Sequence, residues 1–239
     1  MAEAYDLHRP DYAEAAVRWV LEFAPGRRVV DLGAGTGKLT AVLVELGAEV
    51  IAVEPDEAMA GELRRALPAA LALPGSAESI PLPDESVDAV VAGNAMHWFD
   101  LDIAGPEIAR VLGPNGVLAG LWNVMDDRVD WVAGLAQVSG PAAIGPRDTV
   151  TSWREATAHL RSSRFGQPEH AEFPHGQRRT AESLVATLGT RAGMLVMREP
   201  DRTITLDRIR AYLQTRPETA GEFSLPLLTG VLRARRLNP

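Results

Sequence analysis

A glycine-rich turn after a short apolar stretch is the first feature of this sequence that could support chemistry. The stretch ends at a carboxylate, Asp31, and glycine follows at positions 33, 35 and 37. Glycine has no Cβ, so it tolerates positive φ and lets a ligand lie directly against the backbone. A strand that runs into such a turn and then into a helix is how α/β sheets bind nucleotide-like cofactors. We therefore expect a cofactor at this turn.

The spacing of the glycines separates this turn from two common types. A phosphate-binding P-loop needs G-x-x-x-x-G-K-[ST], but Leu32 and Leu39 stand where its first Gly and its Ser or Thr should be. A dinucleotide-binding turn needs G-x-G-x-x-G, and Lys38 occupies its last position. The pattern that remains is Asp-x-Gly-x-Gly-x-Gly.

A second carboxylate supports a nucleoside-like ligand. The apolar run 49–53 ends at Glu54-Pro55, and in nucleotide-binding α/β units an acid about 20 residues after the first glycine accepts hydrogen bonds from the ribose hydroxyls. One carboxylate can accept from both hydroxyls. The glycine turn and Glu54 together therefore predict a site for a ribose-containing cofactor.

The elements that must hold these residues alternate between helix and strand. Apolar periodicity and capping signals predict helices at 12–23, 39–46, 56–67 and 103–112, and strands at 29–31, 49–54, 70–73, 87–92 and 117–122. This alternation indicates βαβ units and a right-handed parallel sheet. The predicted fold class is α/β, with a doubly wound, mostly parallel sheet.

The second half of the chain has weaker signals. Its Gly- and Pro-rich stretch 139–146 suggests a connection, 153–160, 181–188 and 206–213 look helical, and 222–226 with 229–232 could supply a final strand. We expect one domain over 1–239, with a cofactor-binding core in 1–125. Residues 126–239 would then add closing strands and a small helical insertion.

Composition limits the classes of function. The net charge of −8 argues against a protein that grips nucleic acid. There is no cysteine, which excludes disulfides, thiolate metal sites and cysteine-bound iron–sulfur clusters. His8, His159, His170 and His175 lack metal-ligand spacing, so no metal is expected. The N-terminal residues lack the apolar segment of a signal peptide and no apolar run is long enough for a membrane span, so we expect neither feature. A cytoplasmic protein is expected, with its oligomeric state left open.

Four segments carry a resemblance to a known family. They are Tyr5-x-x-x-Arg9-Pro10-x-Tyr12, the Gly33 turn through Glu54-Pro55-x-x-x-Met59, Ala77-Glu78-x-Ile80-Pro81, and Asn94-Ala95-Met96-His97-Trp98-Phe99. With the Gly113 to Gly116 turn they resemble class I S-adenosylmethionine (SAM)-dependent methyltransferases, in the group that includes trans-aconitate methyltransferase. The resemblance implies a seven-stranded Rossmann-like sheet whose last strand is antiparallel, with SAM across the carboxyl ends of strands one, two and four.

The resemblance also implies roles for individual residues. Those that would hold SAM are Asp31, Gly33, Ala34, Gly35, Glu54, Pro55, Met59, Ala77, Glu78 and Asn94. Asp31 and the glycines would surround the methionine moiety, and Glu54 would bind the ribose. Met59 and the Ala77-Glu78 loop would contact the adenine. Asn94 would help to hold the methionine end.

A further set is expected on the substrate side. Tyr5, Arg9 and Tyr12 precede the first strand and would form a lid. Trp98 and Trp122 could shelter the sulfonium with their aromatic faces. His97 is the candidate catalytic residue, as a base for a hydroxyl or amine acceptor.

The expected activity is methyl transfer to a small molecule with a hydroxyl, carboxylate or amine acceptor. Methyltransferases that act on nucleobase or protein amide nitrogens often carry Asn/Asp-Pro-Pro-Tyr/Phe after strand four, whereas this chain has Asn94-Ala95-Met96-His97. The alternatives are a SAM-binding module without turnover and a nicotinamide-dependent oxidoreductase on a similar fold.

Overall fold

The computed structural model describes residues 12–145 and 164–237. The first half contains α2 (Glu14–Leu21), β1 (Arg28–Leu32), α3 (Lys38–Glu45), β2 (Glu49–Glu54), α4 (Glu57–Ala66), β3 (Leu71–Pro74), β4 (Val87–Gly93), η1 (Met96–Trp98), α5 (Leu101–Val111) and β5 (Leu112–Met125). The second half contains α6 (Asp130–Ala143), β6 (Glu169–Thr180), α8 (Ala181–Gly189), α9 (Ala192–Leu195), α10 (Glu199–Gln214), η3 (Pro217–Thr219) and β7 (Glu222–Arg235).

The strands form one seven-stranded sheet in the order β3-β2-β1-β4-β5-β7-β6. Neighbours from β3 to β5 are parallel, and β7 is antiparallel to both β5 and β6. The expected doubly wound, mostly parallel α/β sheet is confirmed. From β1 the chain first adds β2 and β3 on one side and then crosses to add β4 and β5 on the other side. Ligands of such sheets bind outside the carboxyl ends of the strands at this switch point, between β1 and β4.

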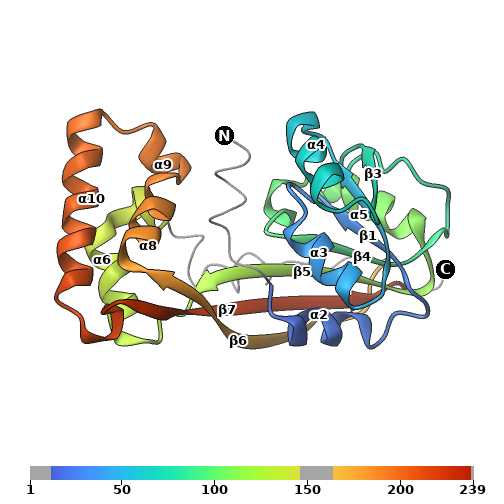
Figure 1. The fold of residues 1–239 in the computed structure, drawn as a ribbon. Helices are drawn as coiled ribbons and strands as arrows, with labels where there is room; N and C mark the ends of the chain where they lie inside the picture. The colour runs from blue at the N-terminus through green and yellow to red at the C-terminus, as the bar shows by residue number, and fades with distance from the viewer. Residues whose placement is uncertain (1–11, 146–163, 238–239) are drawn as a thin grey trace.

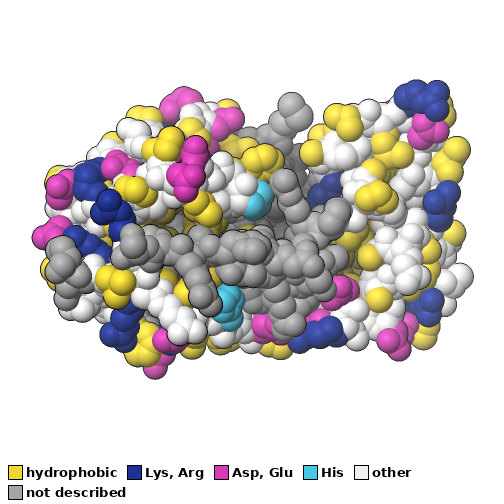
Figure 2. All heavy atoms as spheres, turned by 180° about the vertical axis from the view of Figure 1, so that it is seen from behind, with side chains coloured by type: hydrophobic (Ala, Val, Ile, Leu, Met, Phe, Trp, Pro, Cys, Tyr) yellow, Lys and Arg dark blue, Asp and Glu magenta, His cyan; other side chains and the backbone are white. Residues whose placement is uncertain are grey.

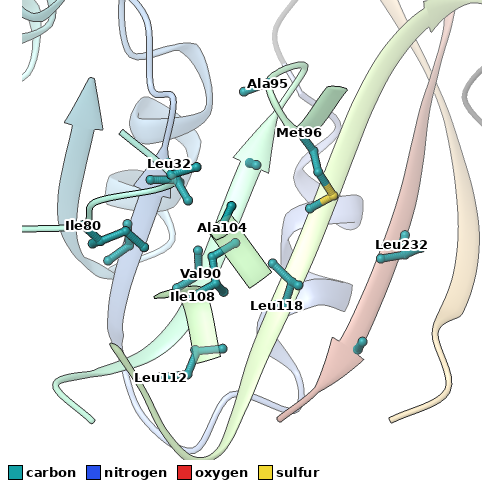
Figure 3. Close-up of a cluster of buried hydrophobic side chains, with 14 of the residues drawn as sticks. Leu32, Ile80, Val90, Ala95, Met96, Ala104, Ile108, Leu112, Leu118 and Leu232 are labelled. Atoms are coloured by element: carbon teal, nitrogen blue, oxygen red, sulfur yellow. The ribbon is translucent and has the colours of Figure 1, made fainter. Parts of the chain in front are cut away.

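Helices cover both faces of the parallel strands. On one face α2 and α3 pack Val17, Val20 and Leu43 against the sheet, and each of these side chains is fully or almost fully buried. On the other face α5 contributes Ala104 and Ile108, which lie beside Val90 and Leu118 (Figure 3). Burial on two faces explains why β1 and β4 are nearly continuous apolar runs.

A second apolar core lies in a helical cluster formed by α6, α8, α9 and α10. Figure 1 shows the long strands β5, β6 and β7 running from the parallel part of the sheet to this helical cluster. Trp131 of α6 meets Phe223 of β7 edge-on, with ring centroids 5.7 Å apart. Leu188 of α8 and Ile209 of α10 are fully buried in the same core. The expected helical insertion is therefore present.

Two expectations for the second half are wrong, and one cannot be compared. The stretch expected as a connection begins inside α6, which passes through Gly140 at φ 68° and continues to Ala143. Residues 169–180, for which no element was expected, form β6. The helix expected at 153–160 lies outside the described residues. Within the described part of the chain, no helix is long and apolar enough to cross a membrane.

Candidate active site

A cavity of about 350 Å³ opens at the carboxyl ends of β1, β2 and β4, within the size range of small-molecule sites. Its wall contains all ten residues expected to hold the cofactor: Asp31, Gly33, Ala34, Gly35, Glu54, Pro55, Met59, Ala77, Glu78 and Asn94. Tyr12 and Trp98 also line it. The structure thus brings together residues that are far apart in the sequence.

The glycine turn needs its glycines for two different reasons. Gly33 has φ +70°, and a Cβ there would lie 2.8 Å from the Cβ of Ala95, so space and backbone both exclude a side chain. Gly35 has φ +58°, and a Cβ there would meet nothing closer than Sδ of Met59, at 4.0 Å. A side chain at position 35 would therefore stand in the cavity, and glycine there leaves the backbone open to a ligand.

Asp31 is a fully buried carboxylate at the end of β1. The Thr40 hydroxyl donates to its Oδ2 at 2.6 Å, whereas its Oδ1 is buried without a hydrogen-bond partner in the described part of the chain. Burial raises the pKa of Asp31 to about 7, against the lowering effect of the Thr40 hydrogen bonds. A buried polar atom without a partner is costly, so this oxygen is suited to a ligand that donates a hydrogen bond.

Glu54 joins the glycine turn to the start of α4. Its Oε2 accepts from the Gly35 N–H at 2.8 Å, and its Oε1 accepts from the Asp56 N–H at 2.9 Å. Asp56 in turn caps α4, because its Oδ1 accepts from the Ala58 and Met59 N–H groups. An ionised carboxylate has about four acceptor positions, so Glu54 can hold the turn and still accept from a ligand.

The Ala77-Glu78 loop closes another side of the cavity. Oε1 of Glu78 accepts from the Asp100 N–H at 3.0 Å, and this bond is the main cause that lowers the pKa of the Glu78 carboxyl. Glu78 therefore ties its loop to the residue that caps α5. Its carboxylate has this structural partner in addition to its place on the cavity wall.

Asn94 turns the chain directly after β4. It has φ +49°, a conformation that asparagine tolerates better than most residues. Its Oδ1 accepts from the Asn123 N–H at 3.2 Å. Beside it, the Tyr12 hydroxyl would lie 2.6 Å from a Cβ on Gly93. Tyr12 therefore packs on the end of β4 at the cavity wall.

Trp98, His97 and Trp122 were also expected on the substrate side, and of these three Trp98 lines the cavity. Its side chain is 73% exposed. His97 is exposed and does not line the cavity; its ring centroid lies 5.0 Å from that of Trp98. Trp122 is only 5% exposed and packs over Gly120 in the core, so its expected place beside the substrate is corrected. Tyr5 and Arg9 lie outside the described residues.

Sequence reasoning missed a row of polar side chains on three strands, Asn123 of β5, Thr229 of β7 and His175 of β6, which we call the polar row. The Thr229 hydroxyl donates to Oδ1 of Asn123 at 2.6 Å and accepts from the Ala13 N–H at 3.1 Å. Nε2 of His175 lies 3.1 Å from the same hydroxyl oxygen. The Thr229 hydroxyl has one hydrogen, which it donates to Asn123, so we assign the donor role in this contact to the Nε2–H of His175. Only strand pairing could have revealed the row, since these residues are far apart in sequence.

Comparisons with known proteins give this arrangement a family. Residues 30–120 match the model of a methyltransferase domain. A Mycobacterium tuberculosis protein, called an uncharacterised methyltransferase, is 42% identical over 233 residues, covering 97% of this chain and 92% of its own length. The chain belongs to the class I SAM-dependent methyltransferases.

Two further comparisons agree with this membership. The solved structure of a candidate type II methyltransferase from Anaeromyxobacter dehalogenans matches with a TM-score of 0.68 and 28% identity, covering 97% of this chain and 99% of that one. The malonyl-[acyl-carrier protein] O-methyltransferase of Methylococcus capsulatus is 43% identical over 101 residues, 40% of this chain and 37% of its own length. The likeness to trans-aconitate methyltransferase in particular stays an expectation.

The cofactor of this methyltransferase is SAM, and the cavity fits it chemically. SAM offers an ammonium group, and Asp31 has a buried oxygen that needs a donor. SAM also offers two ribose hydroxyls, and Glu54, itself 7% exposed, has further acceptor positions at the cavity. Apolar Pro55, Met59 and Ala77 complete the wall where a flat base could lie.

Proposed function

We propose that this methyltransferase transfers the methyl group of SAM to a small molecule through a hydroxyl, carboxylate or amine acceptor. The observation that carries the proposal is the hydrogen bond between Asn94 and Asn123. It joins the wall of the cofactor cavity to the polar row on β5, β7 and β6. In this proposal the half-buried Asn123 and His175, which the fully buried Thr229 holds by hydrogen bonds, give a small acceptor polar groups next to the methionine end of the cofactor site.

The charge of the protein supports a small acceptor over nucleic acid. The net charge is −8, whereas proteins that grip nucleic acid neutralise phosphates with a basic surface. In Figure 2, acidic and basic side chains are interspersed over the described part of one face and form no continuous basic stripe there. Small-molecule recognition needs no such stripe.

The cofactor supplies a sulfonium-bound methyl group, so the protein chiefly orients the reactants and excludes water. In this proposal Asp31 accepts from the cofactor ammonium, Glu54 accepts from the ribose hydroxyls, and Asn94 holds the methionine end. Gly33, Ala34 and Gly35 let the backbone approach. Such orientation can supply about 7–11 kcal/mol in well-arranged reactions.

The substrate side is assigned to other residues. Tyr12 packs at the cavity wall next to Gly93, and with Tyr5 and Arg9 it forms the proposed lid. Trp98 offers an exposed ring at the rim. His97 is the proposed base for a hydroxyl or amine acceptor; from its exposed position it would act on an acceptor that reaches the rim. An ionised carboxylate acceptor needs no base.

The proposed acceptor atom is an oxygen or a nitrogen. The relative from Methylococcus capsulatus methylates oxygen by its name, but the matched part is 40% of this chain. A cytoplasmic location is part of the proposal, since the chain has no cysteine and so needs no disulfide-forming compartment.

The experiment that tests the proposal is methyl transfer from radiolabelled SAM to a panel of small hydroxy, carboxy and amino compounds, with DNA, RNA and mixed proteins alongside. We expect transfer to members of the small-molecule panel only. Asn94→Ala should reduce this transfer, whereas Asn115→Ala should not, because Asn115 has the same left-handed conformation near the start of β5, away from the cavity. Transfer to a macromolecule alone would contradict the proposal.

A further inference from the structure

Thr40 is a polar residue in the first turn of α3 to which the proposed function gives no role. It is fully buried and is the third residue of the helix. A threonine hydroxyl in a helix often bonds back to a carbonyl of the preceding turn, as that of Thr205 does to the Asp201 carbonyl at 2.9 Å. The Thr40 hydroxyl instead donates to Oδ2 of Asp31 at the end of β1. Thr40 therefore connects α3 to the cofactor cavity, whose wall contains Asp31.

The start of α3 explains why Asp31 and Thr40 meet. Gly37 precedes the helix at φ +96° and provides no side-chain cap, and the first N–H groups of a helix need acceptors from outside it. Asp31 supplies one, because both the backbone N–H and the hydroxyl of Thr40 form hydrogen bonds to its carboxylate. Two bonds from one residue hold the carboxylate more firmly than the backbone bond alone would.

The other oxygen of Asp31 is left for a ligand. Oδ1 is buried and has no hydrogen-bond partner in the described chain, although Asp31 lines the cofactor cavity. The last torsion of an aspartate side chain is broad, so a carboxylate that is not held can present either oxygen. The Thr40 hydroxyl selects one orientation, in which Oδ1 is the oxygen that needs a donor.

The surroundings of Asp31 act in opposite directions on its ionisation. Burial is the largest influence and raises its pKa, and the negative charge of Glu54 at the end of β2 raises it further. The Thr40 hydroxyl is the strongest influence that lowers this pKa, and the result is a value of about 7. The described cavity wall also contains three other ionisable side chains, Lys38, Glu78 and Tyr12. Loss of the Thr40 hydroxyl should therefore raise the pKa of Asp31 still further.

We propose that Thr40 is a positioning residue for the cofactor: its hydroxyl holds Oδ2 of Asp31 and so presents Oδ1 to the ammonium group of SAM. This inference rests on the proposed function, because it takes the ammonium group as the ligand of Asp31. It adds the residue that orients and helps to ionise that carboxylate. Thr40 is not among the described residues that line the cavity, so it acts through Asp31 and is not a catalytic residue.

The test compares two ligands of the full chain by calorimetry. S-adenosylhomocysteine carries the ammonium group, whereas 5′-methylthioadenosine has the same nucleoside and sulfur without the amino acid. Thr40→Val keeps the shape of the side chain and removes its hydroxyl. At about pH 6 this variant should bind S-adenosylhomocysteine about tenfold or more weakly than the wild type, since a hydrogen bond to a charged group is lost. Its affinity for 5′-methylthioadenosine should be unchanged.

The pH dependence of affinity separates positioning from a role in folding alone. The ligand ammonium favours ionised Asp31, so the affinity of the wild type for S-adenosylhomocysteine should rise up to about pH 7. In Thr40→Val the rise should end about one pH unit or more higher. Thr40→Ser keeps a hydroxyl and should behave as the wild type does. Thr205→Val is the matched control, because Thr205 is also a buried helical threonine and its hydroxyl bonds to a backbone carbonyl.

Three results would overturn the inference. Equal losses of affinity for the two ligands in Thr40→Val would show that the hydroxyl only supports the fold, and an unshifted pH dependence would show that it does not act on Asp31. A Thr40→Ser protein with the losses of Thr40→Val would show that the hydroxyl is not the cause. Should Thr40→Val fail to fold, the smaller Thr40→Ala takes its place. Failure of the proposed function would show differently, as unchanged affinity of Asp31→Asn for S-adenosylhomocysteine.

Discussion

The Thr40 hydroxyl donates to one oxygen of Asp31 at 2.6 Å, and the other oxygen of that carboxylate is buried without a partner in the described chain. The two residues sit on opposite sides of the glycine turn, at the end of β1 and within α3. The unpartnered oxygen makes Asp31 costly for the free protein. This loss of stability in the ligand-free protein is expected at a site that binds a cationic ligand, because the ligand supplies the missing hydrogen bond.

The first prediction concerns stability and pH. Burial raises the pKa of Asp31 from its ordinary 3.8 to about 7. Between these values the folded protein holds a proton that the unfolded chain has lost. The free energy of unfolding should therefore fall as pH rises through this range, by up to about 1.4 kcal/mol per unit, and level off above it. Urea unfolding at several pH values should show this slope in the wild type, while Asp31→Asn should lose it.

Asp31 also predicts how cofactor binding depends on pH. The cofactor ammonium favours the ionised carboxylate, so binding must displace the proton that Asp31 holds below about pH 7. Affinity for S-adenosylhomocysteine should rise with pH up to this value, and calorimetry should detect release of a proton. An exposed control, Asp84→Asn, should keep this behaviour, and a pH-independent affinity in the wild type would contradict the role of Asp31.

Substitutions at two glycines should distinguish an effect on cofactor binding from an effect on stability alone. Gly35→Ala should cost about 1–2 kcal/mol of stability, because its φ is +58°, and should also weaken cofactor binding by placing a methyl group in the cavity. Gly61→Ala in α4 meets no atom within 4 Å and should stabilise the helix by about 0.5–1 kcal/mol. Thermal unfolding and calorimetry give both quantities. A Gly35→Ala protein with wild-type affinity would show that the backbone does not contact the ligand there.

Parts of this structure follow from local sequence and parts do not. β2 ends at Glu54, as predicted, and α4 follows the cap residue Asp56, where a helix was predicted to begin. An apolar run that ends in a carboxylate and a cap residue are both local signals. β6 was missed because Pro174 and Gly176 interrupt a polar stretch that forms a strand by pairing along its whole length with β7. The polar row depends on the same pairing, so neighbouring residues in the sequence give no sign of it.

His97 gives a kinetic prediction. If His97 is the base, His97→Asn should lower kcat about 10²–10⁴-fold and leave affinity for S-adenosylhomocysteine unchanged, because the side chain does not line the cofactor cavity. The pH profile of kcat should lose its acidic limb. His170→Asn, at the start of β6, is the control. A His97→Asn protein with wild-type kcat and an unaltered pH profile would show that His97 is not the base and only packs against Trp98.

The proposed lid can be tested by removing residues 1–11 while keeping Tyr12. Tyr12 is 8% exposed and packs on the end of β4, so the shortened chain retains this contact. Turnover and cofactor affinity should both fall, because closure excludes water from the site. Arg9→Ala in the full chain shows how much of the loss comes from one cation. A shortened protein with intact affinity and turnover would rule out the lid.

The most direct test of the account is calorimetric titration of S-adenosylhomocysteine and NAD into the wild type, Glu54→Ala and Glu49→Ala. Glu54 holds the glycine turn and faces the cavity, whereas Glu49 is exposed at the opposite end of the same strand. We predict that S-adenosylhomocysteine binds the wild type and Glu49→Ala equally, that Glu54→Ala binds it more weakly by about 1.5–3 kcal/mol, and that NAD gives no binding heat. Binding of NAD, or wild-type affinity in Glu54→Ala, would contradict the account.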